Sequence, residues 1–153
     1  MTTRIGRADF DDPALAAFLQ AHLDDLAPTA PAESRHALDI TKLQAPHVRL
    51  WVMYDGDRLI ATGALAGLQP GHEELKSMRT DPTRRREGLA RGILDHLIAD
   101  AVSRGVTQLW LETGSMDFFA PARALYLSAG FEPCGPFGDY VEDPNSVFMT
   151  RRL

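Results

Sequence analysis

The sequence predicts one mixed α/β domain that spans residues 1–153. Segments with the two-residue period of strands alternate with segments of helical period, in the order β-α-α-β-β-β-α-β-α-β-β. A chain of 153 residues suits one domain, and it contains no internal repeat, linker or low-complexity stretch. An Asp-Gly dipeptide between two apolar runs marks a β-hairpin, so the sheet contains antiparallel strands.

The first half of the chain combines two helices with several strands. In order, we expect a strand at residues 2–9, a helix at 12–27, a loop at 29–39 that leads into a short helix, two strands within 48–68 and a strand within 72–82. Pro13 suits the first position of a helix. Asp55-Gly56-Asp57 forms the turn between the paired strands, and Asp81-Pro82 ends the strand that follows them.

The second half of the chain alternates helices with strands. We expect a helix from Gly88 to about Ser103, a strand at 107–113, a helix at 120–130, a strand followed by an irregular loop within 131–146, and a last strand at 147–153. Leu89, Ile93 and Leu97 fall on one face of the first of these helices. Gly105 and Gly130 are the expected stop residues, because glycine readily adopts the backbone conformation that closes a helix.

Composition excludes several classes of partner. The formal net charge of −5 argues against a nucleic-acid-binding protein, which needs a basic face. The single cysteine, Cys134, cannot form an internal disulfide, which fits a cytoplasmic protein. The N-terminus lacks the apolar core of a signal peptide, and no apolar run approaches the ~20 residues of a membrane span. His47, His72 and His96 have no metal-ligand spacing, so we expect no metal.

The segment TRRREGLARG, residues 83–92, places four arginines and two glycines in a turn between a strand and a helix. The first backbone N–H groups of a helix lack partners and carry partial positive charge, so they attract anions. Gly88 and Ala90 let an anion approach the backbone closely, and Arg85, Arg86 and Arg91 add positive charge. The turn therefore indicates a phosphate site, with a solvated basic turn as the alternative.

The pattern Arg85-x-x-Gly88-x-Ala90 resembles the [Q/R]-x-x-G-x-[G/A] signature with which GCN5-related N-acetyltransferases (GNATs) hold the pyrophosphate of acetyl-coenzyme A. The segments ELKSMRTDPTRRREGLARGILDHLIADA and ARALYLSAGFEP are similar to consecutive elements of that family, and CGPFGDYVEDPNSVFM resembles an uncharacterised bacterial subgroup. Neither the P-loop pattern nor G-x-G-x-x-G is present, which counts against a nucleotide-binding domain that merely shares the basic turn.

The resemblance implies the GNAT fold, in which a bulged strand splays from its parallel neighbour and admits the pantetheine arm. A bulge also follows from the sequence, because Leu75 and Met78 are three residues apart and a bulge between them would turn both to the core. A strand without a bulge is the alternative. The implied cofactor contacts are Met78, Arg79, Thr80, Arg85, Arg86, Glu87, Gly88, Leu89, Ala90 and Arg91.

By the same resemblance, Tyr126 is the expected general acid and Glu74 the expected general base, acting through water. The alternatives are a packing role for Tyr126 and solvation of Glu74 together with its neighbour Glu73, one of which should face solvent because side chains alternate along a strand. Glu112, at the end of the following strand, is a reserve base.

The acceptor site is implied near ESRHALD, where Arg35 and His36 are candidate substrate contacts and Arg79 could also hold a carboxylate. His22 falls on an apolar helix face and is expected in the core. Many family members carry an asparagine where this chain has Phe119. Its contact with pantetheine must be missing or made by a neighbour such as Ser115 or Asp117.

The predicted function is therefore direct transfer of an acetyl group from acetyl-CoA to an amine, with a small amino-acid-like amine as the expected acceptor. A non-catalytic acyl-CoA-binding module and a protein-amine acetyltransferase are the alternatives. Members of the family often dimerise, so a homodimer is also an expectation.

Overall fold

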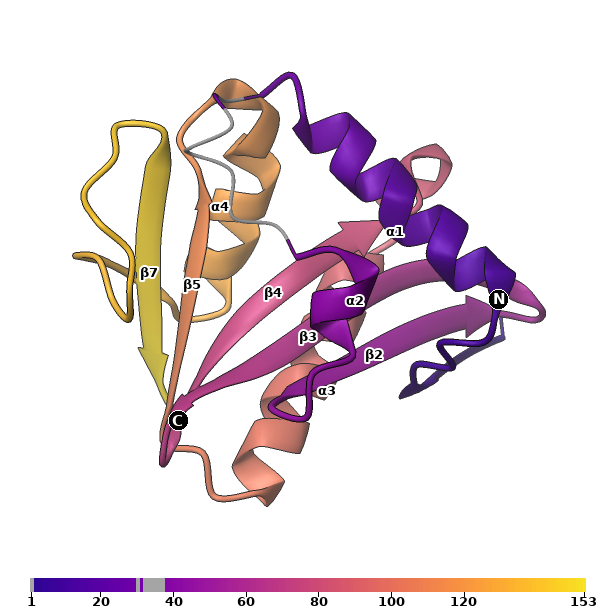
Figure 1. Cartoon of the computed structure of the whole chain (residues 1–153), viewed down its shortest axis with the longest axis horizontal. Helices are drawn as coiled ribbons and strands as arrows, with labels where there is room; N and C mark the ends of the chain where they lie inside the picture. Colours follow the sequence, from indigo (N-terminus) through magenta and orange to yellow (C-terminus); the bar gives the residue numbers. More distant parts are fainter. Residues whose placement is uncertain (1, 30, 32–37) are drawn as a thin grey trace.

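The computed structural model describes residues 2–29, 31 and 38–153 and contains a seven-stranded mixed sheet with helices on both faces (Figure 1). The elements are β1 (Thr3–Arg7), α1 (Pro13–Leu26), α2 (Ile40–Leu43), β2 (Val48–Asp55), β3 (Arg58–Gln69), β4 (His72–Thr80), α3 (Leu89–Ser103), β5 (Gln108–Gly114), α4 (Ala120–Ser128), β6 (Glu132–Cys134) and β7 (Ser146–Arg152), with short 3₁₀ turns at Pro82–Arg84 and Asp117–Phe119. The strand order is β1-β2-β3-β4-β5-β7-β6. These elements confirm the predicted α/β fold.

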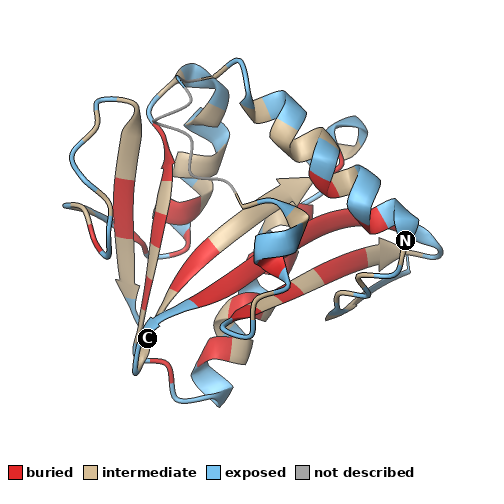
Figure 2. Ribbon diagram, viewed as in Figure 1, coloured by how far each residue is buried: buried red, intermediate tan, exposed pale blue. Residues whose placement is uncertain are grey.

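The helices cover the two faces of the sheet in pairs. In Figure 1, α1 and α2 lie in front of the central strands, whereas α3 and α4 lie behind the sheet. Leu15 and Leu19 of α1 and Leu43 of α2 pack with apolar residues of β2 and β3 in one cluster. A second cluster lies between the sheet and α3 and α4. The buried residues are accordingly concentrated in the central strands and on the inner faces of the helices (Figure 2).

The sheet opens between β4 and β5, the one parallel pair among the described strands (Figure 1). The two strands pair only over a short segment, in which His72–Leu75 of β4 lie beside Gln108–Leu111 of β5. Beyond Leu75, β4 stays paired with β3, and β5 continues beside β7 to Gly114. The two C-terminal halves therefore diverge, and backbone groups along their facing edges have no partner strand.

A β-bulge in β4 accompanies this opening. In the pairing with β3, Thr62 lies opposite Arg79 and Ala64 lies opposite Lys76, so two residues of β4 face Gly63 alone. The first of them, Ser77, has a φ of 54°, and its carbonyl accepts a 2.8 Å hydrogen bond from the Thr62 hydroxyl. The predicted bulge is confirmed: Leu75 is buried in the core, and the half-buried Met78 packs against it.

Gly63 is required by this bulge, because Met78 occupies the space that a side chain would need. A Cβ atom at Gly63 would lie 2.7 Å from Leu97 Cδ1 and 2.9 Å from Met78 Sδ. We expect Gly63→Ala to lower the free energy of unfolding by about 1–3 kcal/mol, the usual range for overpacking a core. Urea denaturation measures the change. Gly6→Ala is the matched control, since a Cβ there meets nothing within 4 Å. Equal stability of the two variants would contradict the account of the bulge.

Candidate active site

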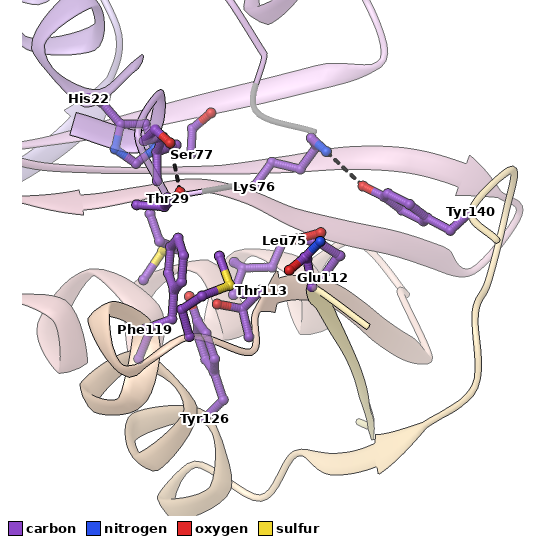
Figure 3. Close-up of a pocket in the computed structure, with 16 residues that line it drawn as sticks. His22, Thr29, Leu75, Lys76, Ser77, Glu112, Thr113, Phe119, Tyr126 and Tyr140 are labelled. Carbon is purple, nitrogen blue, oxygen red and sulfur yellow. Dashed lines mark hydrogen bonds between the residues drawn. The ribbon is translucent and has the colours of Figure 1, made fainter. Parts of the chain in front are cut away.

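A cavity of about 150 Å³ occupies the opening between β4 and β5 (Figure 3). Its lining is drawn from both strands, from α1 and α4, and from the loop before β7. The lining residues are His22, Leu26, Thr29, Leu75, Lys76, Ser77, Met78, Glu112, Thr113, Gly114, Met116, Phe119, Ala122, Tyr126, Tyr140 and Asn145. The cavity thus lies between the two helical layers, at the end of the parallel pairing.

Tyr126 reaches the cavity from α4, the helix that begins after the Asp117–Phe119 turn. Its side chain is buried among core residues, with the ring 5.9 Å from that of Phe131. Burial raises the pKa of the Tyr126 hydroxyl above its ordinary value, so the group keeps its proton at neutral pH. No described residue accepts a hydrogen bond from this hydroxyl. A protonated donor is therefore available to a molecule in the cavity.

Glu112 lines the same cavity from β5. Burial raises the pKa of its carboxyl from 4.5 to about 7, and the negative charge of Glu74 acts in the same direction. The Ser146 hydroxyl donates a 3.1 Å hydrogen bond to Glu112 Oε2 and partly offsets the effect. A carboxyl group with a pKa near neutrality can accept and release a proton under physiological conditions.

Replacement of Glu112 by glutamine should stabilise the protein at alkaline pH. A carboxyl whose pKa is raised on folding favours the folded state only while protonated, so its contribution is lost as the pH rises from about 4.5 to about 7. Glutamine carries no charge at any pH. We expect the free energy of unfolding of Glu112→Gln to exceed that of the parent by about 1–3 kcal/mol at pH 8. At pH 4 the two values should be nearly equal. Urea titrations at both pH values measure the difference, and a variant less stable at pH 8 would contradict it.

Glu74 is buried but is held by two neighbours. Tyr140 donates a 2.5 Å hydrogen bond to Glu74 Oε2, and Lys76 Nζ lies 3.2 Å from the same oxygen. Lys76 Nζ also lies 3.0 Å from the Tyr140 hydroxyl (Figure 3). Glu73 is half-buried on the opposite face of β4, where Arg104 binds both of its oxygens at 2.7 Å.

Two residues near α1 differ from their expected roles. His22 lines the cavity and is not a core residue. Burial lowers the pKa of its imidazole to about 4, so it is neutral at pH 7. Arg79 pairs with Asp25 of α1 at 2.8 Å, and its guanidinium lies over the ring of Phe18. Arg79 therefore joins β4 to α1.

The corner after β5 is apolar at Phe119, the position where the resemblance implied an asparagine. The ring of Phe119 packs on Gly114, where any side chain would overlap it, and lines the cavity. The Ser115 hydroxyl donates to the Pro144 carbonyl at 2.7 Å, and Asp117 is exposed. Neither of these two residues lines the cavity. Arg123 braces the corner by donating to the carbonyls of Gly114 and Met116.

The arginines of the turn before α3 divide into two groups. Arg84 is held by Asp55 at 2.8 Å and by Glu87 at 2.9 Å, so it fixes the conformation of the turn. Arg85 and Arg86 are exposed, and within the described residues no ion pair engages either one. Their charges are available to a ligand.

The N-terminus of α3 lies next to the cavity and has no side-chain cap. Its N-cap is Gly88, with a φ of 76°, a conformation that favours glycine. Leu89, the first residue of the helix, packs in the same cluster as Met78, which lines the cavity. Arg91 reaches Ser128 of α4 at 3.4 Å. The uncapped N–H groups and the available arginines thus lie beside the opening between β4 and β5.

The remaining predictions concern the acceptor contacts, metal binding and membrane spans. Arg35 and His36 lie outside the described residues. In the part of the chain that the structure describes, no cluster of His, Cys, Asp or Glu could hold a metal ion. None of the helices in that part combines the length and the apolarity needed to cross a membrane.

Comparison with known sequences gives one family. Residues 15–131 match the model of the acetyltransferase (GNAT) family. The uncharacterised N-acetyltransferase YsnE of Bacillus subtilis is 48% identical over 139 residues, 91% of this chain and 92% of that protein. YedL of Escherichia coli, also an uncharacterised N-acetyltransferase, is 42% identical over 95% of this chain and 91% of its own. An IAA acetyltransferase of Azospirillum brasilense is 38% identical, over 88% and 86% of the two chains.

Solved structures have the same fold. A protein of Klebsiella pneumoniae described as an acyl-CoA N-acyltransferase superposes with a TM-score of 0.83 at 29% identity, over 99% of this chain and 98% of its own. A Bacillus subtilis acetyltransferase solved in complex with CoA gives a TM-score of 0.73 at 16% identity, over 99% of each chain.

Proposed function

The chain belongs to the GNAT family of acetyltransferases, and from that premise we propose that it transfers an acetyl group from acetyl-CoA directly to a primary amine. The observation that carries the proposal is the cavity between β4 and β5, where the buried hydroxyl of Tyr126 and the half-buried carboxyl of Glu112 line one space. A proton donor and a proton acceptor at one site are what transfer from a thioester to an amine requires.

The positively charged groups beside the cavity suit the phosphates of acetyl-CoA. The pyrophosphate would lie at the N-terminus of α3, where Gly88 leaves the first N–H groups uncapped and Arg85 and Arg86 supply charge. The pantetheine arm would run along the unpaired edge of β4 from Met78 to Thr80, like an added strand. The thioester would then reach the cavity.

The reaction needs two proton transfers and no covalent intermediate on the protein. The amine nitrogen attacks the thioester carbonyl, the new C–N bond forms, and the C–S bond breaks. Tyr126 gives its proton to the departing thiolate, whereas Glu112 takes the proton that the amine loses. Glu74, favoured by the sequence, remains a candidate for the second role. Its contacts with Lys76 and Tyr140 both engage the same oxygen, Oε2, and support an orienting part.

A small amino-acid-like amine remains the proposed acceptor, with Arg35 and His36 as the proposed contacts for its carboxylate. Arg79 is a weaker candidate for that contact because it already pairs with Asp25. Homodimer formation and a cytoplasmic location remain proposals from the family resemblance and the single Cys134.

Release of free CoA from acetyl-CoA in the presence of a panel of primary amines tests the proposed function. We expect release that depends on the amine. Arg85→Ala combined with Arg86→Ala should raise the KM for acetyl-CoA about 10-fold or more, since each charge-assisted contact contributes about 1.5–3 kcal/mol. Arg152→Ala, at an exposed position at the far end of β7, is the matched control. Binding of acetyl-CoA without release for any amine would instead indicate a non-catalytic acyl-CoA-binding module.

A further inference from the structure

A second, larger cavity of about 600 Å³ adjoins the first. It lies on the sheet face opposite α3 and α4, between the β3–β4 turn and the loop before β7. Tyr140 lines both cavities, and Glu74, which its hydroxyl contacts, lines the second. A molecule in the second cavity would therefore have one end at Tyr140, next to the space proposed for acetyl transfer.

The wall of the second cavity is aromatic. The rings of Trp110 and Phe137 lie 5.3 Å apart, and that of Tyr140 lies 5.0 Å from Phe137. Hydrogen bonding of Trp110 Nε1 to His72 Nδ1 at 3.0 Å fixes the orientation of the indole. Three fixed rings form a continuous apolar surface that suits another flat ring.

The mouth of the same cavity exposes aliphatic side chains that the fold does not require. Leu68 is 38% exposed and Val141 is 76% exposed, and both line the cavity. Apolar side chains gathered at the rim of a concave site favour an apolar ligand, because covering them removes apolar surface from water.

The charged groups of the second cavity are acidic. Glu74 and Asp139 line it, and none of the described residues that line it is lysine or arginine. Aromatic faces and carboxylates both attract a positively charged group. Lys76 already pairs with Glu74 at 3.2 Å, so Asp139 and the aromatic faces are the lining groups left to attract an ammonium group.

We propose, on the premise of the proposed function, that this second cavity binds the body of the acceptor, and that the acceptor is a primary amine joined by a short chain to a flat apolar ring. The ring lies against Trp110 and Phe137, and the amine end lies at Tyr140, which lines both cavities. The amine then loses its proton beside Tyr140, at the boundary of the cavity that holds Tyr126 and Glu112. This assignment adds a ring to the small amine proposed above, and it applies with or without a carboxylate.

Two pairs of probe amines test the assignment. The first pair is 2-phenylethylamine and ethylamine, and the second is phenylalanine and alanine. In each pair the ring-bearing amine should have a kcat/KM about 10- to 100-fold higher, because a buried phenyl ring is worth about 1.5–3 kcal/mol. The KM for acetyl-CoA should not depend on which amine is used.

Leu68→Trp fills the mouth of the cavity at an exposed position, so the fold should tolerate it. We expect it to lower kcat/KM for the ring-bearing amines about 10-fold and to leave the ringless amines unchanged. Val102→Trp, on the exposed face of α3, is the matched control and should change neither. Equal kcat/KM within each pair in the parent, or an equal loss for both members in Leu68→Trp, would overturn the assignment.

A calorimetric titration of 2-phenylethylamine into the parent and Leu68→Trp proteins separates this assignment from the proposed function. Binding that Leu68→Trp weakens supports the second cavity even if no amine releases CoA, in which case only the proposed reaction fails. Amine-dependent release of CoA without preference for a ring leaves the reaction standing and refutes the ring site.

Discussion

Tyr126→Phe should lower kcat by about 100-fold or more while the protein stays folded. Phenylalanine keeps the ring and its contact with Phe131 but removes the proton that the departing thiolate would receive. No described residue accepts a hydrogen bond from the Tyr126 hydroxyl, so the free energy of unfolding should change little. The KM for acetyl-CoA should change only modestly, since one hydroxyl contact is small beside the contacts of the phosphates. Steady-state kinetics and thermal unfolding measure these quantities.

Tyr54→Phe provides the control for loss of a tyrosine hydroxyl away from the cavity. That hydroxyl donates to Asp12 at 3.0 Å, on the side of the sheet covered by α1, and does not line the cavity. The control should keep the parental kcat. Parental turnover in Tyr126→Phe, with the chemical step shown to limit the rate, would leave Tyr126 as a packing residue.

Glu112→Gln should have the second large effect, a loss of about 100-fold or more in kcat/KM for the amine at pH 8. The parental value should rise as the pH increases through about 7, because Glu112 accepts a proton only when ionised. The variant should lack the rise centred near pH 7 and should gain activity only gradually toward higher pH, as the fraction of unprotonated amine grows. The same substitution is expected to stabilise the protein at this pH, so unfolding cannot explain the loss of activity.

Glu74→Gln distinguishes the two carboxylates. The negative charge of Glu74 raises the pKa of Glu112, so its removal should shift the rise in activity to lower pH and leave most of the activity at pH 8. If the rise of kcat/KM near pH 7 were lost in Glu74→Gln and kept in Glu112→Gln, Glu74 would be the general base.

Features set by local sequence could be predicted well. The spacing of Leu75 and Met78 predicted the bulge, because regular strand alternation would turn the two side chains to opposite faces. The glycine at position 88 and the arginines before it predicted the uncapped start of α3. Both follow from neighbours within a few positions along the chain.

Features set by distant contacts could not be predicted. The ionisation of Glu112 depends on burial between strands and on Glu74, and the contacts of Glu74 include Tyr140, 66 positions away. His22 looked like a core residue because it falls on the apolar face of α1. The end of that face overlies the opening between β4 and β5, where His22 lines the cavity. The position of a helix residue relative to such an opening is a property of the packed sheet.

Direct transfer is tested most directly by initial velocities measured over a grid of acetyl-CoA and amine concentrations. If both substrates meet in the cavity between β4 and β5, the reciprocal plots should intersect, since amine and thioester must be bound together. Parallel lines would indicate an acetylated form of the protein that persists after CoA has left. That result would contradict the account, in which Tyr126 and Glu112 exchange protons with a complex of both substrates and no side chain carries the acetyl group.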